Sequence, residues 1–170
     1  MMNYWEQLLE KAKENHLNYD FDKLKLALAF AEESHQGQYR KSGDDYIIHP
    51  VEVAKILMDM KMDTDTIVAG LLHDVVEDTK LTLLDLEELG FSKTIIETVD
   101  ILTKKKGQDY QSYLNLVKTN ELARVVKLAD LHHNSDLTRL SKITTKDIER
   151  NKKYRSAIAF LSQVEKNSNF

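Results

Sequence analysis

Residues 67–78, IVAGLLHDVVED, decide how this chain folds. Their apolar side chains recur on nearly every side of a helix with 3.6 residues per turn, and Asp63 or Thr64 can cap its N-terminus. A helix that is apolar all round is buried at the centre of a domain, so the neighbouring segments must pack around it. We therefore expect a central helix that begins near Asp63 and runs through Asp78.

The segments on either side also read as helices. The chain has only five glycines and one proline in 170 residues, and β-branched alternation is scarce. The helices that we predict besides the central one span about residues 3–15, 21–36 (capped by Asp20), 49–60, 82–89, 92–103, 109–118, 121–140 and 144 or 145 to about 166. The final residues KNSNF should fray. These features predict an all-α bundle in a single domain over residues 1–170, with its core at about 22–140.

Composition narrows the class of protein. Hydrophobic residues make up 42% and charged residues 31%, which excludes a disordered or low-complexity chain. No apolar run is long enough to span a membrane, and the N-terminus lacks a secretory pattern. Cysteine is absent, which excludes disulfides and thiolate chemistry and makes the cytoplasm the default location. The net charge of −4 argues against a nucleic-acid partner but leaves room for a local basic pocket.

The central helix carries ionisable groups where burial is expected. A buried charge costs several kcal/mol unless it is paired or bound to a cation. On a continuous helix His73 lies one turn before Glu77, and Asp74 lies one turn before Asp78. Glu77 and Asp78 can equally form the exposed end of a helix. His73 and Asp74 follow the apolar AGLL and call for a binding role.

Two more ionisable residues lie in apolar surroundings. Asp130 follows the run VVKLA, with Asn134 one turn later, and His49 lies between Ile48 and Pro50. Taken singly, Asp130 can be a hydrogen-bonded core residue and His49 a buried or capping histidine. Taken with the pair in the central helix, they suggest a shared site.

A metal site built from three helices would take its ligands from His49, His73, Asp74 and Asp130. Four protein ligands saturate a tetrahedral zinc ion, so a catalytic site of this kind requires a six-coordinate ion with two open positions. Manganese fits best, with iron, magnesium or cobalt as alternatives. Such an ion would polarise a phosphoryl oxygen and acidify a bound water, which the acidic pair one turn further on can orient or deprotonate.

A basic loop precedes His49. Arg40 and Lys41 lie between two glycines and Ser42 adds a hydroxyl donor, so the loop can clamp a phosphate group. The alternative is a pair of solvated surface cations, which is the common state of Lys and Arg.

Three other histidines lie near these motifs. We expect His35 to close the metal pocket from behind the ligands. His132 and His133 follow Asp130, but adjacent helical residues point about 100° apart, so at most one of them faces the site. The polar segment KKKGQDY, residues 104–110, is the best candidate for a mobile loop.

Three blocks of the sequence resemble the hydrolase domain of RelA/SpoT-type proteins, a branch of the HD superfamily. They are SHQGQYRKSGDDYIIHPVEVAKIL, GLLHDVVEDT and VVKLADLHHNSDL, and the resemblance extends over about residues 22–140. By size the chain is most similar to the small alarmone hydrolases. The resemblance implies an all-α HD fold, one Mn²⁺, and removal of the 3′-pyrophosphate from guanosine tetra- or pentaphosphate, which yields GDP or GTP and pyrophosphate.

The resemblance also implies roles for single residues. It places the metal ligands on His49, His73, Asp74 and Asp130. It places the acidic pair that acts on the attacking water on Glu77 and Asp78, the contacts to substrate phosphate and base on Arg40, Lys41 and Ser42, and a contact near the ribose on Asn134.

The chain departs from the family pattern at three positions. Leu131 and Asp136 stand where basic residues are usual, and Asp45 stands where proline is usual. The small-molecule substrate can therefore be another nucleotide or phosphorylated metabolite, cleaved by the same metal chemistry. A third possibility is a module that binds a nucleotide without cleaving it, which would require a broken ligand set or a missing acidic pair. The sequence retains both.

Overall fold

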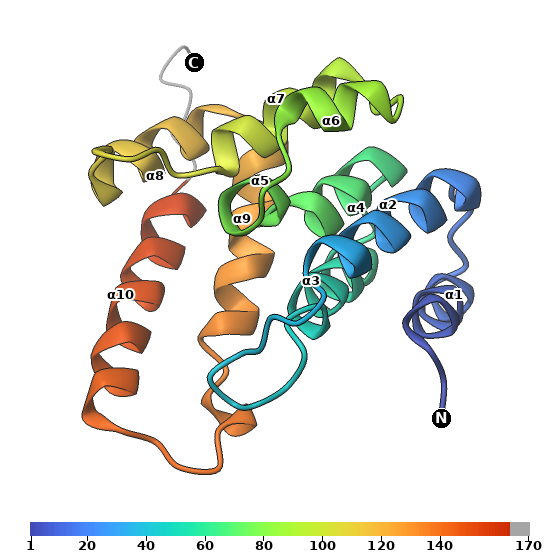
Figure 1. Ribbon diagram of the computed structural model, residues 1–170. Helices are drawn as coiled ribbons and strands as arrows, with labels where there is room; N and C mark the ends of the chain where they lie inside the picture. Colours follow the sequence, from blue (N-terminus) through green and yellow to red (C-terminus); the bar gives the residue numbers. More distant parts are fainter. Residues whose placement is uncertain (164–170) are drawn as a thin grey trace, which may run out of the picture.

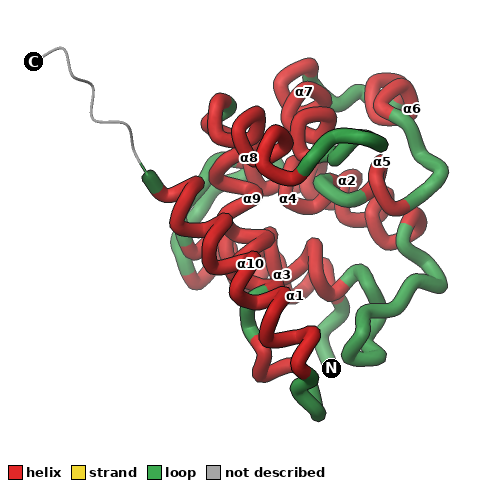
Figure 2. The backbone as a smooth tube through the Cα atoms, turned by 90° about the vertical axis from the view of Figure 1, so that its left-hand side faces the viewer, coloured by secondary structure: helices red, strands yellow, loops and turns green. Residues whose placement is uncertain are grey.

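The computed structural model describes residues 1–163, which form helices joined by short loops (Figure 1). The helices are α1 (Tyr4–Glu14), α2 (Phe21–Ser34), α3 (Ile48–Asp59), α4 (Thr64–Leu72), α5 (Val75–Asp78), α6 (Leu83–Glu88), α7 (Lys93–Leu102), α8 (Tyr110–Thr119), α9 (Glu121–Asn134), the 3₁₀ helix η1 (Leu137–Arg139) and α10 (Thr145–Ser162). Apart from one isolated bridge between Tyr39 and Asp45, the described residues form no β-structure (Figure 2). The expected all-α class is confirmed.

Helix α4 is the centre of the bundle. Every residue from Thr66 to Leu72 is buried, and α4 packs against α2, α3, α7 and α9. Gly70 permits the close approach of α3, because a Cβ atom at that position would lie 2.7 Å from Cδ1 of Leu57. The all-round apolar pattern therefore predicts the burial of this helix correctly.

Polar residues start the helices at the expected places. The carboxylate of Asp63 accepts a hydrogen bond from the amide of Thr66 at 3.0 Å, and the side chain of Asp20 caps α2 in the same way. Such caps satisfy amides that have no partner within the helix. Among the described helices, none is long and apolar enough to cross a membrane.

The central helix is interrupted at His73 and Asp74, which corrects the expectation of one continuous helix. Nδ1 of His73 lies 2.6 Å from the carbonyl oxygen of Gly70, the group that would accept from the Asp74 amide if the helix continued. The chain turns there and resumes as α5. Two adjacent residues of a regular helix point about 100° apart. The turn allows both side chains to face the same point instead.

Two other helices are shorter than expected. Helix α9 ends at Asn134 rather than near 140, because the side chain of Asp136 accepts from the amide of Thr138 and starts η1. Helix α10 ends at Ser162 rather than 166, since Gln163 has extended backbone angles and its amide bonds to the carbonyl of Phe160. The tail KNSNF lies outside the described residues.

Candidate active site

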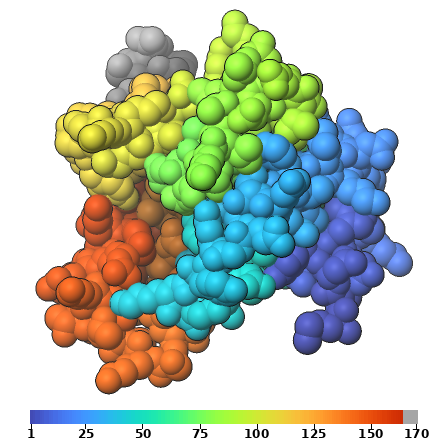
Figure 3. All heavy atoms as spheres, viewed as in Figure 1, coloured from blue at the N-terminus to red at the C-terminus, as the bar shows by residue number. Residues whose placement is uncertain are grey.

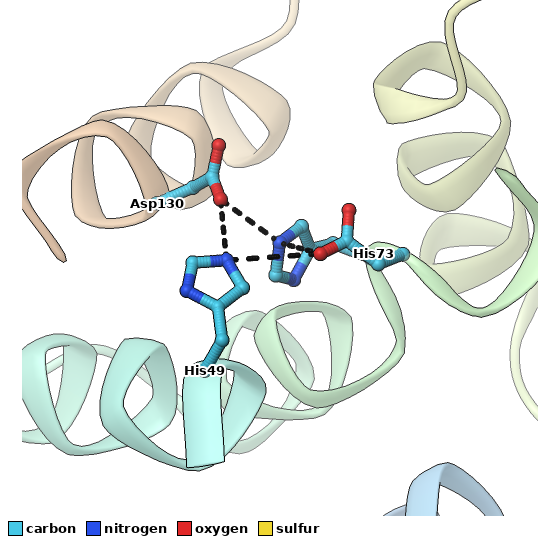
Figure 4. Close-up of side chains that lie close together, drawn as sticks. His49, His73 and Asp130 are labelled. Atoms are coloured by element: carbon cyan, nitrogen blue, oxygen red, sulfur yellow. Dashed lines mark hydrogen bonds and ion pairs between the residues drawn. The ribbon is translucent and has the colours of Figure 1, made fainter. Parts of the chain in front are cut away.

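Four predicted side chains meet between α3, α9 and the turn after α4 (Figure 4). We call them the His/Asp cluster: His49, His73, Asp74 and Asp130. One nitrogen or oxygen atom from each lies within 4.8 Å of the other three. Oδ1 of Asp130 is 2.7 Å from Nε2 of His49 and 3.2 Å from Nε2 of His73. Oδ2 of Asp74 is 3.0 Å from Nε2 of His73 and 3.7 Å from Nε2 of His49.

The cluster is fixed by the elements that carry it. His49 is 1% exposed because it occupies the first turn of α3 before Pro50, on the face that packs against α9. Asp130 is 4% exposed and extends from the buried face of α9. These positions explain how residues that are distant in sequence converge.

The hydrogen-bond partner of His73 decides which of its ring nitrogens can act as a ligand. The carbonyl oxygen of Gly70 can only accept, so the hydrogen of neutral His73 is on Nδ1. Nε2 then presents a lone pair to the oxygens of Asp74 and Asp130. A lone pair facing two carboxylates is unfavourable unless a proton or a metal ion lies between them. Although burial opposes the charged imidazole, the two carboxylates raise the pKa of His73 well above its usual value.

His133 supports His49 from behind. The Nδ1 atoms of the two rings are 2.7 Å apart, and burial lowers the pKa of His133 to about 3, so its ring is neutral. When His49 donates its Nδ1 hydrogen to His133, its Nε2 is left free as a ligand atom. His132 is exposed. The prediction that at most one of these two histidines faces the site is confirmed.

Three further residues hold the carboxylates in place. The hydroxyl of Tyr46 donates to Oδ2 of Asp74 at 2.6 Å, Nζ of Lys127 lies 2.9 Å from Oδ2 of Asp130, and Nδ2 of Asn134 donates to Oδ1 of Asp130 at 3.2 Å. The sequence analysis missed Tyr46 and Lys127. Lys127 had a detectable signal, since it lies in the same apolar run that made Asp130 conspicuous.

The donor set fits a divalent cation. Two carboxylates converge, and among the described residues only Lys127 forms an ion pair with them that does not involve a histidine. Ligands held at about 2.1 Å from one ion lie about 3 Å apart at neighbouring octahedral positions. Three of the four separations given above are close to that value. The two imidazoles and two carboxylates are also ligands that manganese and iron accept.

The acidic pair lies on α5 beside the cluster. Oxygens of Asp74, Glu77 and Asp78 lie within 4.8 Å of one another. Oε1 of Glu77 accepts from the amide of Lys104 at 2.6 Å, which ties the 104–110 segment to the site. Partial burial, followed by the charges of Asp74 and Glu77, raises the pKa of Asp78 to about 6.

A cleft of about 540 Å³ opens beside these acids and is lined by Asp74, Glu77, Asp78, Asp130 and Asn134. Figure 3 shows the surface hollowed between α10 (red) and the loop before α3 (cyan). Tyr46, Tyr110 and Tyr154 also line it, together with Lys127 and Lys153. The cleft therefore combines acids at one end with aromatic and basic groups that suit a nucleotide.

The residues of the basic loop differ in whether they reach the candidate active site. Arg40 lies at the site, where Nη2 donates to Oδ1 of Asn134 at 2.9 Å. Nζ of Lys41 lies 2.6 Å from the carboxylate of Asp147 on α10, so this cation is already paired. The hydroxyl of Ser42 donates to Asp44. A phosphate contact by Lys41 or Ser42 remains a prediction.

His35 reaches the cluster only through Tyr46. Its Nδ1 lies 3.0 Å from the side-chain oxygen of Gln38, and its ring centroid is 4.8 Å from that of Tyr46, which in turn donates to Asp74. His35 therefore packs behind a residue that positions a candidate ligand.

The chain is similar to several proteins of known name. It is 38% identical over 133 residues to "GTP pyrophosphokinase" of Myxococcus xanthus, a match that covers 70% of this chain and 17% of that protein. It is 37% identical over 123 residues to "Bifunctional (p)ppGpp synthase/hydrolase SpoT" of Escherichia coli, with 66% of this chain and 17% of that protein covered. The chain thus spans about a sixth of the length of these relatives.

A solved structure matches over most of its own length. It is described as "A metazoan ortholog of SpoT hydrolyzes ppGpp and plays a role in starvation responses", and it shares 27% identity and a TM-score of 0.69 with this chain. The match covers 85% of this chain and 87% of that one. The family model described as HD domain matches residues 27–125, a segment that contains His49, His73 and Asp74. With more than half of its residues matched, the chain belongs to the HD domain family.

Proposed function

We propose that the chain is a metal-dependent phosphohydrolase that removes the 3′-pyrophosphate of guanosine tetra- or pentaphosphate. The observation that carries this proposal is the His/Asp cluster, in which nitrogens of two imidazoles and oxygens of two carboxylates converge within 4.8 Å of one another, a donor set that suits a divalent metal ion. The similarity to proteins named as (p)ppGpp hydrolases supports the choice of substrate.

The proposed ion is Mn²⁺, held by His49, His73, Asp74 and Asp130. A bound divalent ion would supply Lewis-acid polarisation of a phosphoryl oxygen and a water of lowered pKa. His133 and Tyr46 keep two of the ligands oriented through their hydrogen bonds.

The remaining residues act on water and substrate. The carboxylates of Glu77 and Asp78 orient the attacking water and accept its proton. The water oxygen bonds to the phosphorus attached to O3′, the P–O3′ bond breaks, and O3′ takes up a proton as pyrophosphate leaves. Arg40 and Asn134 bind the nucleotide beside this point, in the position that their mutual hydrogen bond gives them.

A panel of nucleotides tests the proposal. The purified chain, supplied with Mn²⁺, is incubated with guanosine 3′,5′-bis(diphosphate), GTP, GDP and a 3′-monophosphate, and the products are identified by ³¹P NMR. We expect pyrophosphate and GDP from the first compound and little turnover of the others. The Asp130→Asn variant serves as the control and should release neither.

Two outcomes would contradict the proposal. Release of orthophosphate from several nucleotides would favour a general nucleotide phosphatase, a reading that the absence of basic residues at Leu131 and Asp136 leaves open. Turnover that the Asp130→Asn variant retains would show that the cluster does not carry the reaction.

A further inference from the structure

Leu131 and Asp136 occupy the positions where the RelA/SpoT-type pattern usually has basic residues, and both have other roles in this chain. Leu131 is 1% exposed and packs in the core, so it presents nothing to the cleft. The carboxylate of Asp136 accepts from the amide of Thr138 at 2.9 Å and from its hydroxyl at 2.6 Å. Asp136 thereby starts η1, and η1 redirects the chain that follows α9.

That turn brings Arg139 to a second cavity beside the cleft. The cavity has a volume of about 280 Å³, and its cationic lining consists of Arg40, Lys41, Arg139 and Arg150. We call this the basic pocket. Tyr46, Asn134 and Tyr154 line both the pocket and the cleft, so the two are adjacent.

The charges of the basic pocket are poorly balanced. Lys41 and Arg150 share the carboxylate of Asp147, at 2.6 and 3.3 Å. Within residues 1–163, neither Arg40 nor Arg139 forms an ion pair with a carboxylate. Nε of Arg139 is buried and has no hydrogen-bond partner there.

A buried donor without a partner is unfavourable, and more so when the group is charged. Arg40 and Arg139 line the same cavity, and burial first, then the charge of Arg139, lowers the pKa of Arg40. An anion in the pocket would pair with both guanidinium groups, and a phosphoryl group fits their planar geometry.

We propose that Arg139, with Arg40, binds a second phosphoryl group of the substrate, at a position of the nucleotide away from the one that is cleaved. Arg139 thus supplies from η1 the positive charge that positions 131 and 136 do not provide. The inference rests on the proposed function for the identity of the reacting group. It predicts that the site prefers nucleotides phosphorylated at two separate positions over those phosphorylated at the 3′ position alone.

The kinetic test compares two substrates and three variants. The substrates are guanosine 3′,5′-bis(diphosphate) and guanosine 3′-diphosphate with a free 5′-hydroxyl. Arg139→Ala should lower kcat/KM for the first by about ten- to a hundredfold, mainly through KM, and leave the second unchanged. Arg139→Lys should recover part of the loss, because lysine keeps the positive charge but lacks the parallel N–H donors of the guanidinium group. Arg155→Ala, an exposed arginine of α10, is the matched control and should behave as the parent.

A binding measurement keeps this inference separate from the reaction. Calorimetry of the Mn²⁺-supplied protein compares the affinities for guanosine 5′-diphosphate and guanosine. The preference for the diphosphate should shrink about tenfold in Arg139→Ala and persist in Arg155→Ala. An equal preference in both variants, or none in the parent, overturns the role of Arg139 even if pyrophosphate release stands. If the preference depends on Arg139 but no nucleotide is cleaved, the proposed reaction fails and the anion site remains.

Discussion

The His/Asp cluster and the basic pocket lie on opposite sides of Asn134 and have opposite charge imbalances. In the cluster, a buried and a partly buried carboxylate face histidine nitrogens, with Lys127 as the additional cation. In the pocket, four cationic side chains and one carboxylate line the cavity, and that carboxylate, Asp147, pairs with Lys41 and Arg150. Asn134 contacts both, since it donates to Asp130 and accepts from Arg40.

The two charge distributions indicate which kind of ligand each region is suited to bind. In a partly buried site, charged side chains without a partner are neutralised by the ion or ligand that binds there. The cluster calls for a cation and the pocket for an anion. A phosphorylated nucleotide beside a metal ion would meet both needs, and each prediction below separates the two regions.

The largest effect should come from removing a charge of the cluster. Asp74→Asn keeps the shape of the side chain but removes one of two carboxylates. We expect Mn²⁺ binding to be lost and kcat/KM to fall on the order of a thousandfold or more, since metal catalysis supplies several kcal/mol. Metal content by plasma mass spectrometry and pyrophosphate release check this.

The control for that variant neutralises the acid of the other region. Asp147→Asn removes the carboxylate of the basic pocket and should keep the metal, although the loss of its ion pairs and the weakening of the capping box at α10 reduce stability. Equal metal loss in both variants would mean that the two regions are not distinct.

Glu77→Gln should separate metal binding from water activation. The side chain keeps its size and loses its basicity, so we expect normal Mn²⁺ content and a decrease in kcat of about a hundredfold. The control is Glu88→Gln, an exposed acid at the end of α6. A fully active Glu77→Gln enzyme would remove this residue from the mechanism.

His133→Ala tests the support behind His49. Loss of a hydrogen-bond partner behind a metal ligand typically lowers metal affinity by about ten- to a hundredfold. The exposed neighbour His132→Ala should leave affinity unchanged. Titration with Mn²⁺ measures both. If the two variants bind the metal equally well, the contact between His49 and His133 has no role in the site.

The smallest effect is expected on the substrate side. Arg40→Ala should raise KM about tenfold with little change in kcat and with the metal retained, because it removes a charged hydrogen-bond donor and not a ligand. Steady-state kinetics with guanosine 3′,5′-bis(diphosphate) gives both constants. An unchanged KM would mean that Arg40 does not contact the substrate.

The cluster can be predicted from the sequence because its ionisable side chains lie in apolar stretches that are expected to be buried. His73 and Asp74 lie in the most apolar stretch, and an ionisable group in such a place needs a partner. The same reasoning identifies His49 and Asp130. The interruption after Leu72 is not visible in the periodicity, because it depends on one hydrogen bond from His73 to Gly70.

The basic pocket is harder to predict from sequence. Arg139 lies in a polar stretch, DLTRL, where an arginine is usually solvated. Its position depends on the end of α9 at Asn134 and on the cap by Asp136, both of which differ from the expected helix 121–140. Likewise, the pairing of Lys41 with Asp147 joins residues 106 positions apart, and no local pattern encodes it.

The central claim is that one divalent ion occupies the His/Asp cluster. Crystals grown with Mn²⁺ and measured at the manganese absorption edge test it directly. We expect one anomalous peak per chain, bonded to Nε2 of His49 and His73 and to oxygens of Asp74 and Asp130 at about 2.0–2.3 Å. A Mn²⁺-dependent active protein whose only anomalous peak lies elsewhere, with Nε2 of His73 bonded directly to Asp130, would contradict it.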